Sequence, residues 1–262
     1  MPRYAANLSW LYTEWAMPAR YAAAKADGFQ GVECMFPYDV PLVALQEARE
    51  ESGLRQVLIN APAGDWAAGE RGLAALPHSD DKNRFRQGFA EQALPYAVAL
   101  QCPRIHVLAG LATLTDSSTL QTYVDNLRWA CKQADKHHID VVIEPLNAFD
   151  VPGYALHSFE CAAQVIDTVQ ANNLGLQLDL YHAQRMGLDV CNLVPQWMQT
   201  TQLLHMQVAG APHRHEPHLG EWNWAEVANL IDASGYTGWV GAEYQPSTST
   251  RDGLTWMKEG SI

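Results

Sequence analysis

The chain has 262 residues, and its 17 Lys and Arg residues against 29 Asp and Glu residues give a formal net charge of −12 at pH 7. Such a charge repels nucleic acids and anionic membrane surfaces, so we expect neither as a partner. Hydrophobic residues make up 48% and charged residues 18% of the sequence, which indicates a globular protein with a large core and argues against disorder.

Short apolar runs typical of β-strands recur along the chain, each followed by a longer helical pattern rich in Ala and Leu. Eight runs predict strands, at Tyr4–Leu8, Gly31–Cys34, Gln56–Asn60, Arg104–Leu108, Val141–Glu144, Leu174–Asp179, Leu203–Val208 and Trp239–Glu243. Helical patterns lie between them, such as Met17–Asp27, Pro41–Ser52, Phe85–Leu100, Leu120–His137, Ser158–Asn172 and Trp224–Ser234. The alternation favours a closed (β/α)₈ TIM barrel, with a doubly wound sheet as the alternative.

No linker, low-complexity stretch or charge block interrupts this pattern, so we predict a single (β/α)₈ barrel domain over residues 1–262. The longest interruption is Ala61–Ser79, which contains three glycines. Long loops in barrels are often functional, so we interpret this segment as a loop over one end of the barrel, with a lid as one interpretation of its role.

The ends of the chain and its cysteines bear on where the protein works. Met1-Pro2-Arg3-Tyr4 lacks the apolar core of a signal peptide, and no apolar run approaches the roughly 20 residues that span a bilayer. The five cysteines are scattered and form no Cys-x-x-Cys pair, which is typical of reduced, buried thiols. We therefore expect a cytoplasmic protein that has no membrane partner.

Four of the predicted strands end in a residue with a side-chain oxygen: Glu144, Asp179, Gln207 and Glu243. Successive members lie 28 to 36 residues apart, about one strand-helix unit, so we expect them to converge at the carboxyl end of the barrel, where such folds build their active sites. Three carboxylates and an amide at one point would repel one another without a cation between them, and oxygen ligands suit Mg²⁺ or Mn²⁺.

Each of these residues also has a structural interpretation. A carboxylate at a strand end often caps a helix or joins a loop salt bridge, and the amide of Gln207 could bond a neighbouring backbone group. The sequence therefore predicts a divalent metal site from the register of all four residues, because no single one of them would suffice.

Two further residues near the same end are candidates for substrate contact. His182 follows Asp179 by three residues and could bond a substrate oxygen or take a metal position, of which we favour the substrate contact. Arg214 is a fixed cation suited to a substrate carboxylate or hydroxyl. It stands in the histidine-rich loop 213–218, which lacks the thiolates and the helical spacing of a separate zinc site.

Several segments together resemble the hydroxypyruvate isomerase family within the xylose-isomerase-like barrel superfamily. The resemblance covers almost the whole chain. It is carried by Asn7-Leu8-Ser9 with Thr13-Glu14, Phe36-Pro37-Tyr38, the stretch Gly64-Asp65-Trp66-Ala67-Ala68-Gly69-Glu70-Arg71-Gly72, and Arg214-His215-Glu216-Pro217.

The resemblance implies roles for these residues. It implies that Glu144, Asp179, Gln207 and Glu243 are the metal ligands, and that Glu144 and Glu243 are also the catalytic acid/base pair. Related ketose 3-epimerases place substrate-binding residues where this chain has His182 and Arg214. They carry a glutamate where Asp150 stands, which leaves the role of Asp150 open.

The function that follows is a metal-dependent isomerase acting on a small hydroxy-oxo acid. The substrate pair would be hydroxypyruvate and tartronate semialdehyde, or a 2-oxotetronate and its 3-oxo isomer, with proton transfer through a cis-enediolate. The alternatives are a ketose 3-epimerase and a non-catalytic sugar-binding barrel. A barrel endonuclease would need a multi-zinc centre and a basic face, which the net charge of −12 opposes. By analogy with the family we also expect a homo-oligomer.

Overall fold

A closed barrel of eight parallel strands forms the centre of the protein, whose computed structural model describes residues 1–258. Each strand pairs with the next along the chain, and the last pairs with the first. The strands are β1 (Arg3–Asn7), β2 (Gly31–Cys34), β3 (Arg55–Asn60), β4 (Arg104–His106), β5 (Asp140–Ile143), β6 (Leu174–Asp179), β7 (Leu203–Val208) and β8 (Trp239–Ala242). The predicted (β/α)₈ TIM barrel is confirmed.

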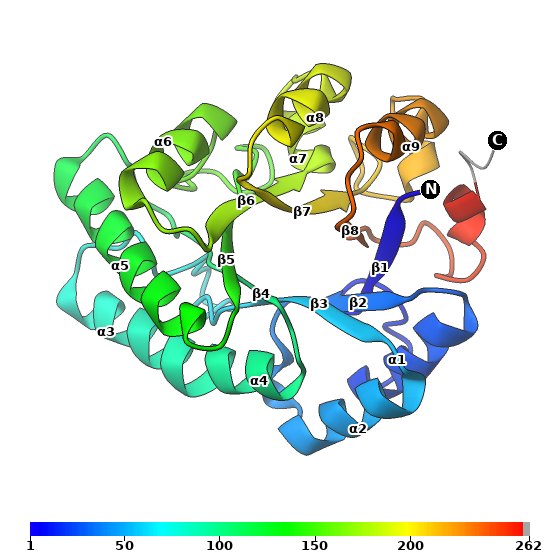
Figure 1. The fold of residues 1–262 in the computed structure, drawn as a ribbon, viewed down its shortest axis with the longest axis horizontal. Helices are drawn as coiled ribbons and strands as arrows, with labels where there is room; N and C mark the ends of the chain where they lie inside the picture. The colour runs from blue at the N-terminus through cyan, green and yellow to red at the C-terminus, as the bar shows by residue number, and fades with distance from the viewer. Residues whose placement is uncertain (259–262) are drawn as a thin grey trace.

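The helices form a ring outside the barrel, as Figure 1 shows in a view down the barrel. They are α1 (Met17–Ala26), α2 (Leu42–Ser52), α3 (Ser79–Gly88), α4 (Leu94–Ala99), α5 (Ser117–Asp135), α6 (Phe159–Val169), α7 (Leu180–Arg185), α8 (Val190–Met198) and α9 (Trp224–Ala233). No helix within residues 1–258 is both long and apolar enough to cross a membrane.

Helix α6 illustrates how the sequence produces this ring. The side chain of Ser158 accepts a hydrogen bond from the backbone N–H of Cys161 at 3.1 Å and so caps the first turn. The buried residues of α6 recur at helical spacing and form one apolar face toward the core: Phe159, Ala162, Val165, Ile166 and Val169.

The segment that we predicted as one helix over Phe85–Leu100 is divided in the structure. Helix α3 begins earlier, at Ser79, and a π-helical turn at Phe89–Ala93 separates it from α4, in which Pro95 cannot donate a backbone hydrogen bond. The prediction of one domain over residues 1–262 stays a prediction, and residues 259–262 lie outside the described part of the chain.

Inside the barrel, a glycine on β8 leaves space for a buried charge on β2. A Cβ atom added to Gly241 would clash with both carboxylate oxygens of Glu33, which is fully buried. Glu33 accepts hydrogen bonds from Asn7 at 3.0 Å and from Gln207 at 2.6 Å, and it lies 2.7 Å from a ring nitrogen of His205. These contacts replace the water that the carboxylate loses on burial.

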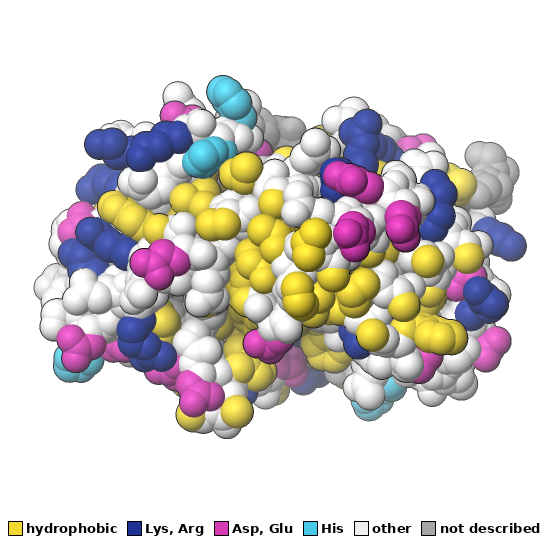
Figure 2. All heavy atoms as spheres, turned by 90° about the horizontal axis from the view of Figure 1, so that it is seen from below, with side chains coloured by type: hydrophobic (Ala, Val, Ile, Leu, Met, Phe, Trp, Pro, Cys, Tyr) yellow, Lys and Arg dark blue, Asp and Glu magenta, His cyan; other side chains and the backbone are white. Residues whose placement is uncertain are grey.

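The outer face over α1, α2 and α4 carries exposed apolar side chains. Val43 on α2 and Val98 on α4 are both exposed. Figure 2, which views the molecule from the side of these helices, shows apolar side chains gathered across the middle of the face and charged side chains toward its margins. The homo-oligomer stays a prediction.

We predict that Gly241→Ala lowers the free energy of unfolding by about 1–3 kcal/mol, the usual cost of overpacking a well-filled core. Gly241 does not have a positive φ, so alanine adds no backbone strain and the effect isolates the contact with Glu33. Urea denaturation followed by tryptophan fluorescence measures the change. An unchanged midpoint would show that the barrel interior has room for the methyl group.

Candidate active site

A cavity of about 250 Å³ opens at the carboxyl end of the barrel. Side chains within one residue of the ends of six strands line it: Asn7, Asn60, His106, Glu144, Gln207 and Glu243. His182 and Arg214 line the same cavity, so the structure brings these two residues together with three of the four predicted metal ligands. The fourth, Asp179, is the last residue of β6 and is buried beside them.

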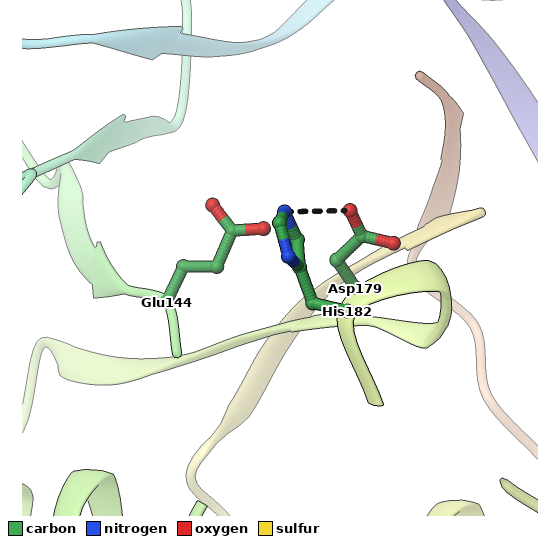
Figure 3. A group of neighbouring side chains, drawn as sticks. All are labelled: Glu144, Asp179 and His182. Carbon is green, nitrogen blue, oxygen red and sulfur yellow. Dashed lines mark ion pairs between the residues drawn. The ribbon is translucent and has the colours of Figure 1, made fainter. Parts of the chain in front are cut away.

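Glu144, Asp179 and His182 form a compact group of possible metal ligands. Each offers one donor atom, and these atoms lie within 4.8 Å of one another. Figure 3 shows the three side chains next to each other, with Glu144 coming from the end of β5 and the other two from the junction of β6 and α7.

The two carboxylate oxygens of Asp179 have different partners. Oδ1 accepts a hydrogen bond from the backbone N–H of Tyr181 at 2.8 Å and thereby caps α7. Oδ2 lies 3.3 Å from Nη2 of Arg214 and 3.7 Å from Nε2 of His182. Oδ1 thus acts as a helix cap, whereas Oδ2 belongs to the candidate site, so both interpretations of Asp179 apply.

The imidazole of His182 is buried, and hydrogen-bond donors lie next to both of its ring nitrogens. Burial, and then the positive charge of Arg214, lower its pKa well below the usual value. Nδ1 accepts a hydrogen bond from the backbone N–H of Asn147 at 3.1 Å, and Nε2 lies 3.4 Å from Nη1 of Arg214. His182 also lines the cavity, where its ring could bond a substrate oxygen or take a metal position.

Arg214 lies between two acidic side chains. Its Nη2 is 3.3 Å from Oδ2 of Asp179 and 3.3 Å from Oε2 of Glu243. Its backbone has a φ of 57°, in the left-handed region that costs a non-glycine residue about 1–2 kcal/mol. Strain of this kind concentrates at functional sites, where the surrounding structure holds it.

Both candidate acid/base glutamates are buried, and burial raises their pKa. The pKa of Glu144 is raised well above its usual value by burial and by the nearby charges of Asp179 and Glu243. Burial raises the pKa of Glu243 to about 8, although Arg214 opposes the rise. Trp10 Nε1 donates a hydrogen bond to Glu243 at 3.2 Å. A carboxyl group with such a pKa can both take up and release a proton near neutral pH.

The site has features that fit a divalent cation. Oε1 of Glu144 is buried and accepts no hydrogen bond from any described residue. Buried polar atoms are almost always paired, and a cation would pair this one. The neighbouring donors are carboxylate and amide oxygens, which are the ligands of Mg²⁺ and Mn²⁺.

A buried network orients the amide of Gln207, and the sequence analysis missed its members. Gln177 Nε2 donates to the Gln207 oxygen at 2.6 Å and to Glu144 at 2.9 Å. On the other side, the Gln207 amide nitrogen donates to Glu33. Gln177 and His205 stand two residues before Asp179 and Gln207 on the same strands, so strand alternation would have placed them inside the barrel.

His106 is another residue that the sequence analysis missed. It is the last residue of β4, it is buried, and neither ring nitrogen has a hydrogen-bond partner among the described residues. Nε2 lies 3.6 Å from Glu144, and burial lowers the pKa of His106 to about 3, which keeps the ring neutral. The ring is therefore free to bond a ligand in the cavity.

Asp150 lies at the edge of the same cavity and is held by two hydrogen bonds. It accepts one from the hydroxyl of Tyr181 at 2.8 Å and one from the amide of Asn147 at 3.0 Å. Asn147 also contacts His182. The structure thus links Asp150 to the surroundings of His182 through Asn147.

The chain is similar in sequence to known proteins over nearly its whole length. Residues 21–260 match the family model described as a xylose isomerase-like TIM barrel. The chain is 43% identical over 260 residues to 2-oxo-tetronate isomerase of Cupriavidus necator and 43% identical over 259 residues to hydroxypyruvate isomerase of Escherichia coli. Each comparison covers 98% of both proteins.

A solved structure gives the same architecture at similar sequence identity. The crystal structure described as an AP endonuclease of family 2 from Brucella melitensis superposes with a TM-score of 0.93. It shares 40% sequence identity, and the match covers 98% of each chain. The chain therefore has relatives of near-identical length and fold.

We predict that Glu243→Gln changes how stability depends on pH in protein treated with EDTA. In the wild type, Glu243 ionises at its ordinary pKa when unfolded but only near pH 8 when folded, so the folded state loses stability as pH rises from about 5 to 8. The variant lacks this loss, and its stability relative to the wild type should rise by at least about 1 kcal/mol over that window.

Urea denaturation at several pH values measures this difference. Glu226→Gln, on the exposed side of α9, is the matched control and should follow the wild type. A difference between Glu243→Gln and the wild type that stays constant with pH would contradict the raised pKa.

Proposed function

Because the chain belongs to the xylose isomerase-like TIM barrel family, and within it to the hydroxypyruvate and 2-oxo-tetronate isomerases, we propose that it interconverts the carbonyl isomers of a small hydroxy-oxo acid. The observation that carries the proposal is a pair of buried glutamates with raised pKa, Glu144 and Glu243, facing one small cavity. The substrate would be hydroxypyruvate or a 2-oxotetronate.

The cation that the site fits would be held by Glu144, Asp179, Gln207 and Glu243. Mg²⁺ and Mn²⁺ are the candidates, because all four side chains offer oxygen. When bound, such a cation polarises a carbonyl and stabilises negative charge on neighbouring oxygens. His182 is left to the substrate, because the four oxygen ligands already supply the donors that these cations prefer.

The proposed reaction needs two groups that carry protons, one to remove a proton and one to return a proton. One glutamate removes a proton from the carbon next to the carbonyl, and the electron pair moves into a carbon–carbon double bond, giving a cis-enediolate. The other glutamate returns a proton to the former carbonyl carbon. The proton of the neighbouring hydroxyl passes to the former carbonyl oxygen, so that the hydroxyl oxygen becomes the new carbonyl oxygen. The sum of the two steps adds and removes nothing, so no redox cofactor is required.

The remaining polar groups of the cavity would position the substrate. The ring of His182 would hydrogen-bond a substrate oxygen, and Arg214 would stabilise negative charge on the oxygens next to the reacting carbons. Aromatic side chains would limit the entry of water, since the rings of Trp10 and Trp66 also line the cavity.

The experiment that tests the proposal is an NMR assay in D₂O with hydroxypyruvate, 2-oxotetronates and free ketoses, in Mn²⁺ or Mg²⁺ and then in EDTA. We expect metal-dependent interconversion of an oxo acid with deuterium entering from solvent. Inversion at C3 of a ketose would instead establish an epimerase, and binding without turnover would establish a sugar-binding barrel.

We predict that Glu144→Gln and Glu243→Gln each reduce turnover by at least about 100-fold, because each removes one of the two proton carriers. Both variants should keep the fold, as circular dichroism would show. Glu226→Gln again supplies the control and should retain turnover. Near-normal activity in either active-site variant would refute the assignment of that residue.

We predict that Glu33→Ala weakens Mn²⁺ binding about 10- to 100-fold, the usual effect of removing a group that orients a metal ligand. Glu33 does this through the amide of Gln207. Isothermal titration calorimetry measures the affinity. Gln56→Ala is the control, because Gln56 is equally buried but bonds the hydroxyl of Tyr21. An unchanged affinity in Glu33→Ala would show that Gln207 needs no such support.

A further inference from the structure

Two guanidinium groups line the cavity, and they differ in their partners. Arg214 forms ion pairs with Asp179 and Glu243. Arg71, which comes from the loop between β3 and α3, forms no ion pair with any residue in the described range 1–258. Arg71 thus adds to the cavity lining a positive charge that no carboxylate of the described residues neutralises.

The loop holds Arg71 in place by contacts that leave its charge intact. Nη1 donates to the backbone oxygen of Trp66 at 3.0 Å and to that of Glu70 at 2.8 Å. The guanidinium carbon lies 4.1 Å from the centre of the Trp66 ring, whose centre is 5.5 Å from that of Phe36. The group is thus oriented by a stacked ring and two carbonyls, which reduces the conformational entropy that a ligand must remove.

The nearest acidic side chain in sequence, Glu70, is already engaged elsewhere. It bonds Arg84 on α3 at 2.8 and 2.5 Å, and it also accepts a hydrogen bond from the backbone N–H of Asp65. The hydrogen bonds from Arg84 lower the pKa of Glu70 to about 2. The negative charge of Glu70 is therefore paired with Arg84 and does not neutralise the positive charge of Arg71.

The free edge of Arg71 has the shape of a carboxylate receptor. All hydrogen bonds that Arg71 makes to described residues come from Nη1, so Nε and Nη2 have no protein acceptor there. Those two nitrogens form the fork that binds a carboxylate through two parallel hydrogen bonds.

The charges of the rest of the cavity restrict where a substrate carboxylate could lie. Glu144, Glu243 and Asp150 line it with acidic groups. The charge of Arg214 is shared between two carboxylates. An oxo acid differs from a ketose of equal length by its carboxylate, and Arg71 is the cavity cation with an open position for that group.

We propose that Arg71 binds the carboxylate of the substrate and selects oxo acids over neutral ketoses. The inference rests on the proposed function and adds the residue that sets the substrate class. An acid held at the loop by its carboxylate places its carbonyl and hydroxyl carbons toward the strand ends, where Glu144 and Glu243 stand. Arg71 is then a specificity residue and takes no part in proton transfer.

The test compares two ligands that differ only in charge. Glycerate has a carboxylate but no carbonyl to isomerise, and glyceramide is its neutral amide of the same size. Isothermal titration calorimetry with Mn²⁺ present should show that Arg71→Met weakens glycerate binding at least about tenfold and leaves glyceramide binding within about twofold. Arg71→Lys should retain part of the preference for glycerate, because it keeps the charge but loses the fork.

Arg3→Met is the matched control. Arg3 also stacks on a tryptophan, Trp239, at 4.0 Å and donates to a backbone oxygen, that of Thr237, but it lies at the other end of the barrel. This variant should bind both ligands as the wild type does. In turnover, Arg71→Met should raise KM for the oxo acid and change kcat little.

Two results would overturn the inference. Glycerate binding that does not change in Arg71→Met would show that the carboxylate lies elsewhere, and equal weakening of glycerate and glyceramide would show that Arg71 only supports the loop. Failure of the proposed function has a different signature, because the wild type would then turn over no oxo acid whatever the binding data show.

Discussion

The burial of three carboxylates at one end of the barrel is the constraint on which the rest of the site depends. Glu144, Asp179 and Glu243 lose water together, and burial and mutual repulsion raise the pKa of Glu144 and Glu243. The fold tolerates this because Arg214 and Trp10 contact the carboxylates directly. A cation would complete the same compensation, so the proposed metal site and the proposed pair of proton carriers are compatible with the same residues.

The fold was predictable from the sequence because a (β/α)₈ barrel repeats one signal eight times. Strand ends recur at similar spacing, so the sequence alone predicts that Glu144, Asp179, Gln207 and Glu243 lie in register. The boundaries of the helices were harder to predict from the sequence. The helix expected over Phe85–Leu100 is divided, because a π-helical turn fits the same apolar pattern as a continuous α-helix.

The residues behind the site were harder to predict, for physical reasons. Glu33 lies within β2, where no other site residue was predicted, and a polar residue there faces either the barrel interior or the helices. Only the pairing between strands decides this. Arg71 depends on a loop whose path is set by backbone contacts such as the bridge between Gly72 and Ala109. Its lack of an ion pair also depends on Arg84, which lies thirteen residues further on and engages Glu70.

The double attachment of Asp179 has a mechanical consequence. One oxygen caps α7 and the other faces the site, while His182 lies one turn along the same short helix. The distance between these two residues is therefore set within a single helical turn and does not depend on how the strands pack against one another. When the strands of the barrel move relative to one another, Asp179 and His182 move together. Changes in the geometry of the site then come from the residues on the other strands.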